Sequence, residues 1–131
     1  MKAVMGKEIL LVVGDKKGRL EEISKAIMDA GVNIRAISAW AFDSKAYFRL
    51  VASDNEKAKK AIEGIGIVEE NDVIIVEMPD KTGQLHALAA KLKENKINLN
   101  RIYGTTIEPD KSAIIIFSSE DNDKALEVIR N

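Results

Sequence analysis

The chain of 131 residues contains no cysteine and only one histidine. Without cysteine there is no disulfide framework and no thiol chemistry, and a single histidine leaves little room for a nitrogen-ligated metal site. We therefore expect no metal and no other cofactor. A chain without disulfides suits the reducing cytoplasm, and we expect a cytoplasmic protein.

The chain also lacks an excess of charge and a long hydrophobic run. Its 20 basic and 21 acidic residues nearly balance and are scattered, so no basic surface is present to attract nucleic acid. No strand carries the aromatic pairs with which related folds bind RNA. No segment approaches the roughly 20 apolar residues of a membrane span. We expect neither a nucleic acid nor a membrane as a partner.

Sequence signatures of catalysis are missing as well. There is no activated nucleophile, no glycine-rich phosphate loop and no His-Glu spacing of a metalloenzyme. Carboxylates are plentiful, but none is paired in a way that only chemistry would explain. The sequence predicts that the chain is not an enzyme.

What the chain does contain is an internal repeat. The segment Asp15-Lys16-Lys17-Gly18-Arg19-Leu20 returns sixty-five positions later as Asp80-Lys81-Thr82-Gly83-Gln84-Leu85. Farther along the offset is sixty-seven, which places two extra residues near 108–110. A repeat of this length indicates two similar structural units, which we predict at residues 1–70 and 71–131. The first offset also aligns Ile23 with Leu88, Ile27 with Leu92, Asn33 with Asn98, and Ile37 with Ile102.

The first copy predicts the element order βαββαβ. Residues 1–7 form a lead-in without a clear signal, a four-residue hairpin loop is expected at 42–45, and a turn at 70–72 leads into the second copy. A capping box from Ser53 to Glu56 is expected to start the second helix. The expected strands are 8–14, 34–41, 46–52 and 65–69, and the expected helices are 19–30 and 56–62.

The second copy predicts only βαββα, because no residues follow to form its last strand. Each unit should be an α+β, ferredoxin-like fold in which two helices cover one face of an antiparallel sheet. The missing strand leaves a sheet edge open, and we expect the N-terminal lead-in or a neighbouring chain to pair with it. The expected strands are 73–78, 99–107 and 113–118, and the expected helices are 85–94 and 122–129.

The doubled motif resembles the ACT domain, a small amino-acid-sensing regulatory module. The resemblance rests on a buried strand, the Asp-Lys-x-Gly-x-Leu turn, a helix, and then Gly-Val-Asn-Ile or Lys-Ile-Asn-Leu. It covers nearly the whole chain and is strongest to stand-alone tandem ACT proteins. The usual proline before the glycine is Lys17 or Thr82 here, and Lys96 replaces the glycine that Gly31 supplies. The resemblance implies amino-acid binding between paired domains, a homodimer, and possible regulation of a metabolic enzyme.

A free amino acid needs donors for its carboxylate and acceptors for its ammonium group. Backbone N–H groups at a helix start favour a carboxylate, glycine allows close approach, an aspartate can hold the ammonium, and an asparagine can serve both groups. The candidate ligand-binding residues are Asp15, Gly18, Arg19, Leu20, Asn33 and Ile34 in the first copy, and Asp80, Gly83, Gln84, Leu85, Asn98 and Leu99 in the second.

Structural roles remain open for these residues. The aspartates can cap helices, the glycines can serve the turn, and the asparagines can satisfy a tight connector. His86 fits an exposed helix position, Trp40 fits a core or an interface, and Tyr103 could line an interdomain pocket. Two functions stay in competition, an amino-acid-binding regulatory protein and a ligand-free dimerising scaffold.

Overall fold

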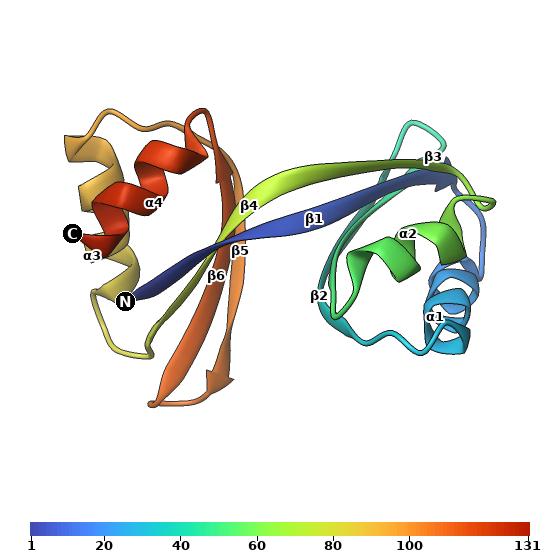
Figure 1. Cartoon of the computed structure of the whole chain (residues 1–131), viewed down its shortest axis with the longest axis horizontal. Helices are drawn as coiled ribbons and strands as arrows, with labels where there is room; N and C mark the ends of the chain where they lie inside the picture. The colour runs from blue at the N-terminus through green and yellow to red at the C-terminus, as the bar shows by residue number, and fades with distance from the viewer. The chain divides into compact units, whose positions relative to one another are not determined.

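The computed structural model describes residues 1–131, and its elements alternate as the repeat predicts (Figure 1). The order βαββαβαββα confirms the α+β class and the ferredoxin-like repeat. The elements are β1 Lys2–Gly14, α1 Arg19–Asp29, β2 Ile34–Phe42, β3 Lys45–Ala52, α2 Asn55–Ile62, β4 Ile67–Pro79, α3 Gln84–Glu94, β5 Leu99–Glu108, β6 Ser112–Ser119 and α4 Asn122–Arg130.

The chain divides into two compact units that are not two consecutive halves. The first unit is Lys7–Asn71, and the second unit is Met1–Gly6 together with Asp72–Asn131. Strand order is β2-β3-β1-β4 in the first unit and β5-β6-β4-β1 in the second. Helices α1 and α2 pack on one face of the first unit's strands, as α3 and α4 do in the second (Figure 1). The predicted first domain of residues 1–70 therefore differs from the first unit at its start.

The two long strands β1 and β4 exchange roles between the units. In each unit one of them is an inner strand, and the other supplies the outer strand beside it. The edge that the second copy leaves open is thus paired with the N-terminal segment, as the sequence predicted. Ala3 is only 4% exposed and belongs to the same core as Ile74 and Val76. Arg130 of α4 also donates from Nε to the carbonyl oxygen of Ala3, at 3.2 Å.

Gly6 explains how β1 fits closely against β4 within the second unit. A Cβ atom at this position would lie 2.7 Å from Cδ1 of Ile75, closer than real contacts allow. Glycine therefore permits the close approach of the two strands. Residues 2–7 of the lead-in, for which the sequence showed no clear signal, are part of the 13-residue strand β1.

The expected turn at 70–72 was wrong, because β4 runs through these residues without interruption. Their polar composition suggested a turn, yet Glu70 faces α2 and accepts from Nζ of Lys59 at 3.4 Å. The hairpin after β2 is also shorter than expected. Phe42 pairs with Lys45, which leaves a two-residue loop of Asp43 and Ser44 with φ values of 51° and 66°. Both angles are those of the tight turn that suits the twist of a hairpin.

The hydrophobic cores of the two units are built from matching positions. Each contains alternate residues of the inner strand, the buried stripe of the first helix, and small or branched residues of the second helix. Leu20 and Leu85 leave this pattern, since they are 56% and 52% exposed. The matching buried pairs are Ile9 and Ile74, Leu11 and Val76, Ile23 and Leu88, Ile27 and Leu92, Leu50 and Phe117, Ala58 and Ala125, and Ile62 and Ile129.

The second helix of each unit starts with an Asp-Asn pair that has two structural tasks. Asp54 is the N-cap and accepts from the N–H of Lys57 at 3.2 Å, so the cap is one residue later than the predicted Ser53. The next residue, Asn55, ties the helix to the sheet, because it accepts from Ala52 N–H and donates to the carbonyl of Lys7. The corresponding residues Asp121 and Asn122 make the same bonds with Lys124, Ser119 and Asp72.

Two extra residues of the second copy lie where the sequence predicted. Ile34 and Leu99 begin β2 and β5 at an offset of 65, whereas Lys45 and Ser112 begin β3 and β6 at an offset of 67. The insertion therefore falls in the β5–β6 hairpin. None of the helices has the length and hydrophobicity needed to cross a membrane.

A charge inside the N-terminal part of β1 should destabilise the second unit. We expect Ala3→Asp to lower the free energy of unfolding by about 3 kcal/mol or more, because the carboxylate would enter an apolar core without a partner. Lys2→Asp is the matched control, since Lys2 is exposed on the same strand. Urea unfolding followed by circular dichroism measures both variants. Equal midpoints for the two would show that β1 does not complete this core.

Candidate functional site

The connector after the first helix has the same backbone structure in both units. Gly31 adopts φ of 74° and donates its N–H to the carbonyl of Met28 at 2.9 Å. Lys96 adopts φ of 57° and donates to the carbonyl of Lys93 at 3.0 Å. The following N–H group returns to Ile27 or Leu92, as in a Schellman helix end. This tight turn places each asparagine directly before the first residue of its strand, Ile34 of β2 or Leu99 of β5.

Asn33 and Asn98 are held by their backbones, which leaves their side chains unengaged. The N–H of Asn33 donates to Oγ of Ser53 at 2.9 Å, and its carbonyl accepts from Ser53 N–H at 2.9 Å. Asn98 makes the equivalent pair with Glu120, through Oε1 at 3.1 Å and the backbone N–H at 3.0 Å. Both residues are exposed, and neither adopts a positive φ. A left-handed connector is therefore not the reason for asparagine at these positions.

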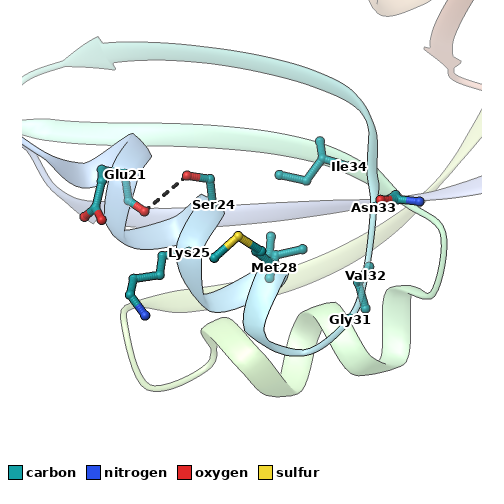
Figure 2. Close-up of a pocket in the computed structure, with 9 residues that line it drawn as sticks. Glu21, Ser24, Lys25, Met28, Gly31, Val32, Asn33 and Ile34 are labelled. Atoms are coloured by element: carbon teal, nitrogen blue, oxygen red, sulfur yellow. Dashed lines mark hydrogen bonds between the residues drawn. The ribbon is translucent and has the colours of Figure 1, made fainter.

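Each asparagine lies at the rim of an open groove. We name the one beside Asn33 the first groove, with a volume of about 740 Å³, and the one beside Asn98 the second groove, with about 420 Å³. In Figure 2, Met28 of α1 and Ile34 of β2 lie on opposite sides of the first groove. The first groove is lined by Glu21, Ser24, Lys25, Ile27, Met28, Gly31, Val32, Asn33 and Ile34, and the second by Ala89, Leu92, Lys93, Lys96, Ile97, Asn98 and Leu99.

The two grooves are the same place in the repeat. Every residue that lines the second groove lies sixty-five positions after one that lines the first. Sequence reasoning identified Asn33, Ile34, Asn98 and Leu99, but it missed the contribution of the helices. Their lining positions follow a helical spacing that places them on one side of α1 or α3. This helical spacing is the sequence signal that could have identified the helix residues of the grooves.

Lys25 contributes a charge to the first groove that is already paired. Its Nζ lies 2.8 Å from Oδ2 of Asp29. This hydrogen bond, with the attraction between the charges, raises the pKa of Lys25 above its ordinary value. Lys25 therefore stays protonated, with Asp29 as its partner.

The two glycine turns exclude the alternative that Asp15 and Asp80 cap the helices. The N-caps of α1 and α3 are Gly18 and Gly83, with φ of 89° and 92°, and no side chain caps either helix. Asp15 makes no side-chain hydrogen bond. Asp80 instead accepts from the N–H of Asp110 at 2.8 Å and so holds the β5–β6 hairpin. No side chain accepts from the first-turn N–H groups of either helix, although the N–H of Gln84 already donates to the carbonyl of Lys81 at 3.2 Å. The remaining first-turn N–H groups can meet a ligand.

Arg19 and Gln84 have different surroundings although they occupy the same repeat position. Nε of Arg19 donates to the carbonyl of Gly14 at 2.8 Å, and its guanidinium also bonds Glu22 at 2.8 Å. Gln84 lines a hollow of about 240 Å³ together with Asp80 and Leu85. His86 is exposed and does not line that hollow. The second turn is thus the more open of the two.

Within one unit, the turn and the asparagine do not meet. The turn lies at the start of α1 or α3, and the asparagine lies beyond its end. Each helix has 11 residues, which corresponds to about 16 Å. No residue of the turn lines the neighbouring groove. Within a single unit, the turn residues and the asparagine therefore cannot contact the same small ligand.

The aromatic residues of the first unit pack on each other. The rings of Trp40 and Tyr47 stack at 5.3 Å, and the guanidinium of Arg49 lies 5.7 Å from the Trp40 ring centre. Trp40 remains 43% exposed. Its partners come from β3, which agrees with a packing role rather than with a place in either groove.

Comparison with known proteins identifies the family. The model of the ACT domain pair matches residues 5–131. The chain belongs to the ACT domain pair family. The two domains of this ACT pair share the fold described above. A search of curated proteins finds no match.

Solved structures share the fold of this ACT pair at low sequence identity. A protein from Bacteroides thetaiotaomicron is 22% identical with a TM-score of 0.89, covering 98% of this chain and 88% of the other. The regulatory subunit of aspartate kinase from Thermus thermophilus is 14% identical with a TM-score of 0.71, covering 98% and 94%. Its counterpart from Thermus flavus is 14% identical with a TM-score of 0.64, covering 98% and 94%.

The two turn aspartates should respond differently to removal. We expect Asp80→Ala to lower the free energy of unfolding by about 1 kcal/mol, because it removes the acceptor for Asp110 N–H. Asp15→Ala is the matched control, and its effect should stay within about 0.5 kcal/mol. Urea unfolding of both variants is the measurement. A loss with Asp15→Ala as large as with Asp80→Ala would contradict the assignment of a structural role to Asp80 alone.

Proposed function

We propose that this ACT pair is an amino-acid-binding regulatory protein of the cytoplasm. The observation that carries the proposal is the pair of asparagine carboxamides, each exposed at the rim of a groove while its backbone alone maintains the connector. A carboxamide has an oxygen for an ammonium group and an N–H for a carboxylate. The structural task and the binding task are thus divided between backbone and side chain.

The surroundings of each asparagine suit a zwitterion. Both grooves lie at the C-terminal end of a helix, where the negative end of the dipole favours a cation such as an α-ammonium group. Apolar residues that line the grooves, Ile34 in the first and Leu99 in the second, can cover the ligand's side chain. The carboxylate then needs donors that the groove itself does not supply.

Those donors are the uncapped N–H groups of a glycine turn. The segment from Gly18 to Leu20 offers such groups at the positive end of a helix, and so does the segment from Gly83 to Leu85 apart from the N–H of Gln84, which donates to the carbonyl of Lys81. Turn and asparagine lie about 16 Å apart within one unit. We therefore propose that the ligand is held between paired ACT domains, with the asparagine from one domain and the turn from another, in the same chain or in a homodimer.

The exposed leucines beside the turns support pairing of domains. Leu20 and Leu85 are each more than half exposed at equivalent positions, as is Met28 in the first groove. Pairing of domains at the turns would cover these side chains and remove their apolar surface from water. A ligand that bound between such surfaces would stabilise one paired arrangement and change how the protein meets a metabolic enzyme.

The alternative of a ligand-free scaffold has one observation in its favour, the structural bond of Asp80. That bond uses the side chain that would otherwise hold an ammonium group. The first copy has no such bond at Asp15, and grooves are present beside both asparagines. The amino-acid-binding function therefore accounts for more of the structure.

A thermal-shift screen against the twenty amino acids tests the proposal. A ligand at about a hundred times its dissociation constant should stabilise the protein by about 2.7 kcal/mol, a shift of several degrees in Tm. Calorimetry should then show loss of binding in Asn33→Ala or Asn98→Ala. Asn100→Ala is the control, because this residue lies on β5 but lines neither groove. A flat screen would argue for the scaffold.

A further inference from the structure

The two grooves occupy equivalent positions but differ in charge. Where the first groove has Met28 and Gly31, the second has Lys93 and Lys96. No acidic residue lines the second groove, whereas Glu21 lines the first. Both lysines are exposed, and neither forms an ion pair.

Acidic groups close to the grooves keep this difference. In the first unit, Lys25 is paired with Asp29, and the connector is held by the uncharged Ser53. In the second unit, Glu120 holds the connector through its carboxylate. The lining residues have a net charge of +2 in the second groove, from Lys93 and Lys96, and of zero in the first, where Glu21 offsets Lys25. When the nearby acids are included, Asp29 at the first groove and its equivalent Glu94 together with Glu120 at the second, the second groove is still more positive by one charge.

Lys96 occupies its position in the second groove although the backbone there adopts a conformation that favours glycine. Its φ of 57° is left-handed, and the equivalent residue of the first unit is Gly31 with φ of 74°. A non-glycine residue in this region costs of order 1 kcal/mol. Open space surrounds Gly31, so no packing demand calls for a long side chain there. The energetic cost of the left-handed backbone is explained if the ammonium group of Lys96 binds a ligand.

Neutralising the end of the helix dipole is not a sufficient reason. The last turn of α3 already contains Lys91 as well as Lys93. Lys91 does not line the groove. A third cation for the dipole alone could occupy a position without backbone strain. Lys93 and Lys96 instead both line the second groove, together with Asn98.

We propose that the second groove binds a ligand with an additional anionic group, an acidic amino acid, and that the first groove binds an uncharged one. Asn98 would contact the α-ammonium end, and Lys93 and Lys96 would bind the side-chain carboxylate. This assignment rests on the proposed amino-acid-binding function and names the class of ligand for one of its two grooves. The two copies of the repeat would then respond to different amino acids.

Calorimetry of the full chain with shape-matched ligands tests the assignment. The probes are L-glutamate against L-glutamine and L-aspartate against L-asparagine. We expect one acid to bind roughly tenfold or more tightly than its amide, because charge-assisted hydrogen bonds to the lysines favour the carboxylate. Raising the salt concentration should reduce this preference, since both lysines are exposed. Asn98→Ala should abolish binding of the acid.

The decisive variant gives the second groove the residues of the first. In Lys93→Met/Lys96→Gly, the acid should lose roughly tenfold or more in affinity and its preference over the amide should vanish. The fold should be retained, because glycine suits the left-handed position. Lys91→Met is the control for loss of a cation in the last turn of α3 outside the groove. It removes one positive charge, against two in the double variant, and it should keep the preference.

The possible outcomes separate this inference from the function on which it rests. Binding of neutral amino acids that needs Asn98, without preference for the acid, would overturn the inference and leave the proposed function standing. A preference that persists in the double variant, or that is lost equally in Lys91→Met, would also overturn it. Absence of binding by any amino acid would overturn both.

Discussion

Pairing of the first residues of β1 with β4 is the contact on which the second unit depends. Residues after Asp72 supply only three strands of a four-stranded fold, and Met1–Gly6 supply the fourth. Backbone N–H and C=O groups at a sheet edge otherwise lack partners, and the core beneath them would be open to water. Ala3 closes that core, and Gly6 lets the strands approach. One unit is therefore inserted into the other along the chain, and neither consists of one uninterrupted half of the repeat.

Much of this fold followed from residue patterns, because those patterns act locally. Apolar periodicity located the helices, and the matching cores of the two units agree with the offsets of 65 and 67. The N-terminal strand was harder, since its alternation is weak and only the missing partner of a distant strand explains it. Glu70 shows the opposite error, in which polar residues suggested a turn although contacts with α2 keep them in a strand. Tertiary contacts decided both cases.

The candidate site was predictable in composition but not in geometry. The recurrence of Asp, Gly and Asn marked the right segments, yet sequence distance does not tell that a helix separates the turn from the asparagine by its full length. The sequence also did not show that the backbone of Asn33 maintains the connector while its side chain stays exposed. This arrangement depends on a hydrogen bond with Ser53, twenty residues away. The positions at which the two copies of the repeat differ are the most informative about the candidate site. Lys96 differs from Gly31 while the backbone stays left-handed, which separates what the turn requires from what the groove adds.

The same comparison gives a role to the buried ion pair of the first unit. Glu8 is completely buried and Arg49 nearly so, with 3.2 Å between Oε1 and Nη1. The repeat places Val73 and Ile116 at these positions, so an apolar pair can serve the same strands. Buried ion pairs add little net stability, but a buried charge without its partner costs about 3–5 kcal/mol. Since Ile116 occupies the position of Arg49 in β6, only β3 offers Glu8 a cation at this position. The ion pair therefore distinguishes the two copies of the repeat at strands that otherwise match closely.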